Sequence, residues 1–253
     1  MRVTTMHETP VALVTGGARG IGESISRLLA QHGHTLVINY FQSEERAARL
    51  VVELQDQGHQ AVAIQCDVGK RADRLRLVDE AMGHFGRIDL LVCSAGVLMG
   101  AYDGIADLEE EAWDATIDTN LKGTYLCTKF AAPWLRRAQR SVLLLIASGA
   151  GVRGASSSFA YAASKAGIHG MQYNFERDLG ASGTRVHVIC PGGIATPLKL
   201  LNIAQGATAR GEDSDAAVAN ARQSLGDPAG VARILTFLAS DDADYVRGTI
   251  FTR

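Results

Sequence analysis

Residues 11–22 read VALVTGGARGIG, a five-residue apolar run followed by a glycine-rich turn, and a helical pattern continues to about residue 32. A strand, a glycine turn and a helix start in this order leave backbone N–H groups free to bind a phosphate. Gly16 suits the turn, Gly20 lets a pyrophosphate approach the backbone, and Gly22 lets the helix pack on the strand. The stretch predicts a dinucleotide-binding unit, although a plain strand-to-helix turn has the same pattern.

Further apolar segments alternate with helical patterns along the rest of the chain, which is typical of a parallel sheet covered by helices. Strands are expected at 36–40, 60–66, 88–96, 141–148, 185–193 and 248–251. A long helical region is expected at about 109–137, and a helix bearing Tyr161 and Lys165 is expected to run to about residue 179. The pattern predicts an α/β fold, a single Rossmann-type doubly wound domain over 1–253, with strand order 3-2-1-4-5-6-7.

Residues 198–226 differ from this pattern, because they are rich in alanine, glycine, asparagine and acids and show little periodicity. Such a segment beside a ligand site is typical of a substrate lid. A poorly packed surface excursion has the same composition, so both interpretations stay open.

Composition excludes several classes of protein. The formal net charge of −2 and the lack of a basic stripe argue against nucleic-acid binding. No apolar run approaches the roughly 20 residues of a membrane span, and the start lacks a signal-peptide core. The four dispersed cysteines have no disulfide or metal-ligand spacing, so we expect buried, reduced thiols, no metal site and a cytoplasmic protein.

The end of the second strand bears on the choice of cofactor. Dinucleotide folds often place an acid there to bind the adenosine ribose, but the residues from Asn39 through Tyr40 to Ser43 include none. Arg19, inside the glycine turn, can form a forked contact with a 2′-phosphate. Both features favour NADP over NAD, although NAD stays possible because Arg19 also fits an ordinary surface arginine.

Two other strand ends are expected near the same site. Asp67 and Val68 close the third strand, where the aspartate either meets an adenine edge or caps the next helix. The fourth strand runs into a turn at Ala95 and Gly96. In a doubly wound sheet the strand order reverses between the first and fourth strands, and ligands bind outside their carboxyl ends.

Tyr161 and Lys165 are four residues apart, so on a helix they share a face. A phenol loses its proton only near pH 10. A neighbouring ammonium lowers that pKa and yields a group able to transfer a proton near neutrality. Ser148 ends an apolar run and is expected to hold a substrate oxygen near the Tyr161 hydroxyl. An exposed Tyr and Lys on an amphipathic helix would show the same spacing.

Taken together in order and spacing, these motifs resemble the short-chain dehydrogenase/reductase family over nearly the whole chain. The family's glycine pattern TGxxxGxG matches residues 15–22, and its active-site asparagine matches Asn120, which is otherwise unfavourable in a helix. Its serine, tyrosine and lysine match Ser148, Tyr161 and Lys165. Its proline–glycine motif matches PGGIATP at 191–197.

The resemblance implies a nicotinamide cofactor and a catalytic set of Asn120, Ser148, Tyr161 and Lys165. Tyr161 would exchange a proton with the substrate oxygen, Lys165 would lower its pKa and hold the nicotinamide ribose, and Asn120 would hold a water. The cofactor-binding residues would be Thr15, Gly16, Arg19, Gly20, Ile21, Gly22, Tyr40, Ser43, Asp67, Val68, Ala95, Gly96, Tyr161, Lys165, Pro191, Gly192, Ile194 and Thr196.

The sequence departs from the family at two places. Cys93 and Ser94 replace two asparagines that in the family support the sheet and the adenosine side of the cofactor site. His187 stands in the sixth strand where the family often has asparagine, and we interpret it as structural.

The resulting hypothesis is an NADP(H)-dependent oxidoreductase acting on a ketone or secondary alcohol, with no metal. Val97, Leu98, Ala150, Val152 and Phe159 are expected to form an apolar substrate wall. Two alternatives stay open. A 3-oxoacyl carrier-protein reductase would need a basic docking patch, for which residues 136, 137 and 140 are candidates, and a non-catalytic dinucleotide sensor would tend to lose Tyr161 or Lys165. Family analogy implies a homo-oligomer, a tetramer or a dimer.

Overall fold

A seven-stranded parallel sheet forms the centre of the protein in a computed structural model that describes residues 9–252. The strand order is β3-β2-β1-β4-β5-β6-β7, as the sequence predicts. The strands are β1 (Val11–Thr15), β2 (Thr35–Tyr40), β3 (Ala61–Gln65), β4 (Leu90–Cys93), β5 (Val142–Ile146), β6 (Arg185–Cys190) and β7 (Gly248–Phe251).

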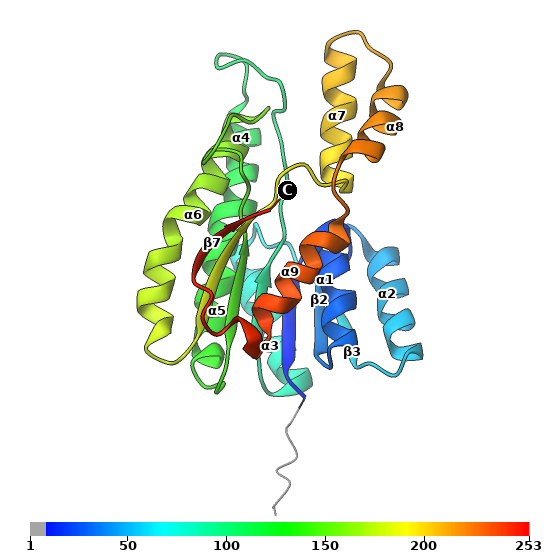
Figure 1. The fold of residues 1–253 in the computed structure, drawn as a ribbon. Helices are drawn as coiled ribbons and strands as arrows, with labels where there is room; N and C mark the ends of the chain where they lie inside the picture. The colour runs from blue at the N-terminus through cyan, green and yellow to red at the C-terminus, as the bar shows by residue number, and fades with distance from the viewer. Residues whose placement is uncertain (1–8, 253) are drawn as a thin grey trace, which may run out of the picture.

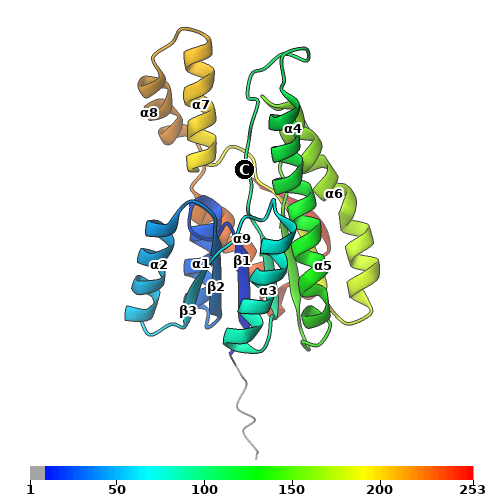
Figure 2. The same ribbon diagram turned by 180° about the vertical axis from the view of Figure 1, so that it is seen from behind.

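Helices cover both faces of this sheet (Figures 1 and 2). One face carries α1 (Gly20–Gln31), α2 (Glu44–Asp56) and α9 (Pro228–Ala239), and the other carries α3 (Arg71–Phe85), α5 (Gly123–Leu135) and α6 (Phe159–Gly180). Alternate residues of each strand enter opposite cores: Leu143 packs with the α3–α5–α6 layer, and Leu144 with the α1–α2–α9 layer. Burial on both sides explains why these strands are mostly apolar.

The helical region expected at 109–137 is interrupted. It consists of α4 (Glu110–Ile117), a π-helical turn (Asp118–Lys122) and α5. The π turn contains Asn120, whose side chain is buried. Such turns are rare and frequently occur at functional sites, and hydrophobic periodicity alone does not reveal them.

Residues 198–226 are more regular than their composition predicts. They form most of α7 (Pro197–Ala209) and α8 (Ser214–Ser224), which project beyond the carboxyl ends of the strands (Figure 1). Side chains start both helices, because Thr196 and Asp213 accept hydrogen bonds from first-turn amides. Four residues of α7 are buried but none of α8, so α8 is the lightly packed part of this segment.

Other expectations concern the whole chain. All four cysteines are free and buried, as predicted, and burial raises the pKa of the Cys66 and Cys93 thiols to about 12. Within residues 9–252, no helix is both long and apolar enough to cross a bilayer. Residues 1–8 and Arg253, which belong to the predicted domain, lie outside the described residues.

Candidate active site

The glycine turn is shaped by close backbone contacts that leave no room for a Cβ at Gly16 or Gly22. Gly16 and Gly20 have positive φ angles of 63° and 57°. A Cβ on Gly16 would lie 2.8 Å from the Cα of Ala95, and one on Gly22 would overlap the carbonyl oxygen of Gly16. The N-cap of α1, Arg19, makes no side-chain capping bond. Gly20 and Ile21, at the start of α1, border a cavity, where helix amides favour an anion.

Asn39 holds this turn, a role that sequence reasoning missed. Its Oδ1 accepts from the Gly16 amide at 3.1 Å, and its Nδ2 donates to the carbonyl oxygens of Tyr40, Ile64 and Cys66. The side chain therefore connects the glycine turn to β2 and to the chain after β3. The only signal in the sequence was that Asn39 stands near the end of β2, where dinucleotide folds often have an acidic residue.

Thr15 and Asn120 support the turn that follows β4. The Thr15 hydroxyl accepts from the amides of Ser94 and Ala95. Asn120 Oδ1 accepts from the Val97 amide at 2.8 Å, while its Nδ2 donates to the Val97 carbonyl and to Ser164 Oγ. Both side chains are buried and act through the backbone they hold.

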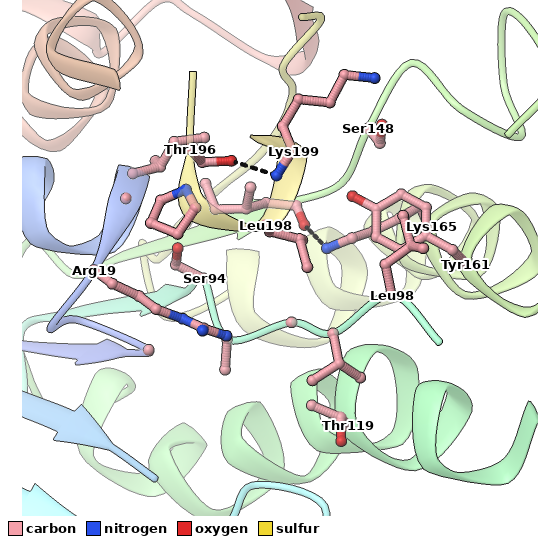
Figure 3. Close-up of a pocket in the computed structure, with 18 of the residues that line it drawn as sticks. Arg19, Ser94, Leu98, Thr119, Ser148, Tyr161, Lys165, Thr196, Leu198 and Lys199 are labelled. Atoms are coloured by element: carbon pink, nitrogen blue, oxygen red, sulfur yellow. Dashed lines mark hydrogen bonds between the residues drawn. The ribbon is translucent and has the colours of Figure 1, made fainter. Parts of the chain in front are cut away.

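The start of α6 brings the predicted proton-transfer group to the cavity. Ser158 caps the helix by accepting from the Tyr161 amide. Tyr161 and Lys165 extend from this helix into the cavity, with Ser148 beside them (Figure 3). Lys165 Nζ donates to the Ile146 carbonyl at 2.7 Å. The structure therefore brings these three residues together, as the sequence predicts.

The electrostatics of this group differ from the expectation. Burial is the largest influence and raises the pKa of Tyr161, while a hydrogen bond with Ser148 lowers it. Burial also lowers the pKa of Lys165 to about 8. The expected lowering of the phenol pKa by the ammonium is not among these influences, because burial disfavours the Lys165 charge and its Nζ is directed to the Ile146 carbonyl.

The cavity has a volume of about 1040 Å³, at the upper end of the usual range for ligand sites. Most of the predicted cofactor residues line it: Gly16, Arg19, Gly20, Ile21, Tyr40, Ser43, Asp67, Val68, Ala95, Gly96, Tyr161, Lys165, Pro191, Gly192, Ile194 and Thr196. Thr15, Gly22 and Asn120 do not line it, and they shape the backbone behind it. Asp67 also accepts from the Gly69 amide, so it organises its own loop.

The substrate end of the cavity is only partly as expected. Val97, Leu98 and Ala150 line it, but Val152 and Phe159 do not. Phe159 is 48% exposed, because the first residue of α6 faces away from the cavity. The β4–α4 loop (94–109) and α7 also contribute Tyr102 and Asn202, two lining residues that sequence reasoning did not single out.

Of the residues that depart from the expected pattern, Cys93 and His187 are buried in the sheet and Ser94 is at the cavity. Cys93 is buried between β4 and α5, with its Sγ 3.9 Å from the Thr128 hydroxyl, whereas Ser94 lines the cavity. His187 is buried in β6 and neither ring nitrogen has a hydrogen-bond partner. In the part of the chain that the structure describes, no three metal-ligating side chains gather at one place.

Sequence comparison assigns the chain to a family. Residues 10–204 match the family model for short chain dehydrogenase. The chain belongs to the short-chain dehydrogenase family. A 3-oxoacyl-acyl-carrier-protein reductase of Staphylococcus aureus is 33% identical over 252 residues, covering 96% of both chains. Versicolorin reductase of Emericella nidulans is 32% identical over 247 residues, covering 95% of this chain and 92% of that protein.

Solved structures of the short-chain dehydrogenase family give the same result. Levodione reductase superimposes with a TM-score of 0.85 at 27% identity, covering 96% of this chain and 95% of that one. A short-chain dehydrogenase/reductase from Serratia marcescens gives 0.81 at 25% identity, covering 96% of each. The protein is therefore an oxidoreductase of the type that uses a nicotinamide dinucleotide and acts on CH–OH or C=O groups.

The residues at the cavity fit such a cofactor. The close backbone contacts at Gly16 and Gly22 exclude a Cβ at these two positions, and Gly20 and Ile21, the first residues of α1, line the cavity. A pyrophosphate is the group that such a turn accommodates. Lys165 and Tyr161 border the same cavity at its other end.

Proposed function

We propose that the protein is an NADP(H)-dependent oxidoreductase that interconverts a ketone and a secondary alcohol, with Tyr161 as the proton donor and acceptor. The proposal rests mainly on one observation: Tyr161 and Ser148 border the same cavity as the glycine turn (Figure 3). A bound nicotinamide supplies or accepts the hydride at the substrate carbon. The protein must then supply or remove the proton at the substrate oxygen.

The state of Tyr161 suits the direction of ketone reduction. Because burial raises its pKa, the phenol keeps its proton near neutral pH and can donate it to the oxygen of a reduced carbonyl. Ser148, hydrogen-bonded to Tyr161, is placed to orient that oxygen. Alcohol oxidation requires the phenolate, so we expect its rate to rise with pH while the rate of reduction falls.

Lys165 and Asn120 have supporting roles in this proposal. Lys165 has a pKa of about 8 and is mostly protonated at pH 7, so its charge stabilises the phenolate left after proton donation. Asn120 positions the backbone at Val97 and contacts Ser164, one residue before Lys165.

The decisive experiment replaces Tyr161 with phenylalanine. We expect kcat for ketone reduction to fall by about 10²- to 10⁴-fold, the usual contribution of a general acid, while NADPH binding measured by fluorescence changes little. Tyr245→Phe is the matched control, because Tyr245 is fully exposed and lies outside the cavity lining. Unchanged turnover in Tyr161→Phe would remove this mechanism. Absence of turnover in the wild type with NADPH bound would favour the sensor.

The preference for NADP rests on Arg19 and on the missing acid after β2. Arg19 is exposed at the cavity rim, and the residues at 39–43 include no carboxylate. Arg19→Ala should weaken NADPH binding about tenfold or more, the scale of a charge-assisted contact, and leave NADH binding nearly unchanged. Arg46→Ala, at an exposed site on α2 outside the cavity lining, is the control. Equal losses for both cofactors would contradict the preference.

The second candidate function is reduction of a 3-oxoacyl thioester on a carrier protein, which the similarity to the Staphylococcus aureus reductase favours. The expected basic patch is weak, because Arg136 pairs with Asp178 and Arg140 pairs with Asp241. Assays of acetoacetyl-CoA beside cyclic ketones, each with NADPH and NADH, separate the two functions. A kcat/KM at least tenfold higher for the thioester would favour the second candidate.

We also propose a homo-oligomer, a tetramer or a dimer, in the cytoplasm. Exposed aromatic side chains support association through α5 and α6, where Tyr125 and Tyr173 are 44% and 70% exposed. The four unpaired cysteines suit a reducing compartment. Light scattering coupled to size-exclusion chromatography measures the oligomeric state, and a monomer at micromolar concentration would contradict this proposal.

A further inference from the structure

The α7–α8 segment (residues 196–225) leaves and rejoins the domain at one place. Gly193 and Ile194 come before it and Gly226 follows it, and Ile194 and Gly226 form a parallel bridge. The Ala195 amide donates to the Gly226 carbonyl, and the Gly226 amide donates to the Gly193 carbonyl. The segment is thus anchored at its base, and any restraint on its position over the cavity must come from contacts farther along it.

One such restraint comes from Tyr102 in the β4–α4 loop, which rises between α7 and α4 (Figures 1 and 2). The Tyr102 hydroxyl donates to the Asn202 carbonyl of α7 at 3.2 Å. Its ring lies against Gly206, because a Cβ there would come within 2.6 Å of Tyr102 Cζ. The tyrosine therefore spans the gap between the loop and the helix.

The backbone of Tyr102 is strained in a way that keeps this contact. Its φ of 71° makes it the one non-glycine residue with positive φ among residues 9–252. Bulky side chains adopt this conformation only when the surroundings impose it. The Tyr102 amide donates to the Ser157 carbonyl at 2.7 Å, which fixes the residue against the loop before α6.

Asn202 of α7 makes a second contact with the loop before α6. Its side chain is 5% exposed, and its Nδ2 donates to Ser157 Oγ at 2.9 Å. The neighbouring Ser158 donates to the Met99 carbonyl and caps the helix that carries Tyr161. The three segments around the substrate end of the cavity are thus linked through Tyr102, Asn202 and Ser157.

We propose that this Tyr102–Asn202–Ser157 bridge holds α7 over the substrate end of the cavity and sets the upper size limit of the substrate. Tyr102 lines the cavity and is also 45% exposed to solvent. Its side chain therefore lies between the cavity and the solvent and forms part of the cavity wall. The preferred substrates are compact, ring-sized ketones, and extended ones are disfavoured. The substrate class in this inference rests on the proposed function, whereas the role of the bridge in holding α7 does not depend on it.

The first test is steady-state kinetics with NADPH on cyclohexanone and the bulkier 2-tetralone. Tyr102→Ala removes the wall, so the ratio of kcat/KM for the bulky ketone to that for the compact one should rise about tenfold, the usual effect of a changed pocket wall. Gly206→Val displaces the Tyr102 ring from the other side and should raise the same ratio. Leu201→Ala, at an exposed position of α7, is the control and should leave the ratio unchanged.

The second test is independent of turnover. In Tyr102→Phe the ring stays and the hydrogen bond is lost, so the amides of α7 should exchange with deuterium about two- to tenfold faster, while those of α5 stay unchanged. Unchanged exchange of α7 in this variant overturns the bridge. Faster exchange with an unchanged size ratio overturns the size limit. If the wild type binds NADPH but reduces neither ketone, the proposed function and the size limit fail, and exchange alone decides the bridge.

Discussion

The glycine turn and the α7–α8 segment both border the cavity, but different kinds of interaction hold them. At the turn, backbone meets backbone, because a Cβ on Gly16 or Gly22 would collide with main-chain atoms. In the α7–α8 segment, α8 contains no buried residue, and side-chain hydrogen bonds from Tyr102 and Asn202 connect α7 to the loops opposite.

This difference suits a cleft that is proposed to bind a cofactor at one end and a substrate at the other. Close backbone packing tolerates almost no change, so it places a turn rigidly for a group that is the same in every catalytic cycle. A side-chain hydrogen bond contributes about 0.5–1.5 kcal/mol net, so a segment held by a few of them can move or be remodelled at low cost. We therefore expect mutations to have large global effects at the turn and small, local ones at α7.

The largest effect should come from Gly22→Ala. The new Cβ would overlap the Gly16 carbonyl oxygen and lie 2.9 Å from the Gly16 carbonyl carbon, and backbone cannot yield as a side chain can. We expect a loss of about 3 kcal/mol in the free energy of unfolding, measured by urea denaturation. Gly83→Ala is the control, since α3 leaves open space there, and it should be neutral or slightly stabilising. Similar stabilities for the two variants would refute the contrast.

The next largest effect should come from Asn39→Ala. This change removes Oδ1, which accepts from the Gly16 amide, and Nδ2, which donates to three backbone carbonyls. The Gly16 amide would lose its side-chain acceptor and the three carbonyls would lose this donor, although the Tyr40 carbonyl keeps the Cys66 amide, at a cost of about 2 kcal/mol. Urea denaturation and NADPH titration should both report the change. Asn174→Ala, at an exposed site on α6, should stay within about 0.5 kcal/mol of the wild type. If NADPH affinity were unchanged, Asn39 would not position the turn.

The next prediction concerns His187, which is buried in the sheet with no hydrogen-bond partner for either ring nitrogen. Burial, with Arg185 and Arg247 nearby, lowers its pKa to about 4 from an ordinary value near 6.5. The unfolded chain binds a proton in this interval and the folded chain does not, so stability falls as pH drops from about 6.5 toward 4. The loss should be about 2 kcal/mol at pH 5.

The corresponding variant is His187→Leu, which replaces the two unpartnered ring nitrogens with carbon. Its stability should depend less on pH, and the difference from the wild type should widen between pH 7.5 and pH 5 in urea titrations. Parallel curves for the two proteins would mean that His187 titrates normally in the folded state.

The smallest effect should come from Ser158→Ala, at the start of α6 and next to Ser157, which binds the Asn202 side chain of α7. Losing this helix cap should cost about 1 kcal/mol and lower kcat several-fold, because the cap also fixes the position of Tyr161. Asp213→Ala removes a similar cap from α8 and should leave kcat unchanged. Equal effects of the two variants on kcat would show that the link from Ser158 to the catalytic helix is unimportant.

The same contrast explains what the sequence could predict. The strand order, the glycine turn and the grouping of Ser148, Tyr161 and Lys165 follow from local periodicity and short motifs, and the structure confirms them. The bridge through Tyr102 joins residues 100 positions apart, and no local pattern encodes such a contact. The π turn at Asn120 and the helices within 198–226 were also missed, because weak periodicity hides elements whose helical state depends on tertiary contacts and caps.

The place of β1 in the interior of the sheet, between β2 and β4, has a consequence for synthesis of the chain. Ala12 pairs with Leu36 on one side and with Leu90 on the other. At about 5–20 residues per second on the ribosome, the second edge of β1 waits several seconds for β4 to emerge. An open strand edge attracts other chains, so we expect ribosome-bound chains that end before Leu90 to recruit chaperones more strongly than chains that extend beyond it.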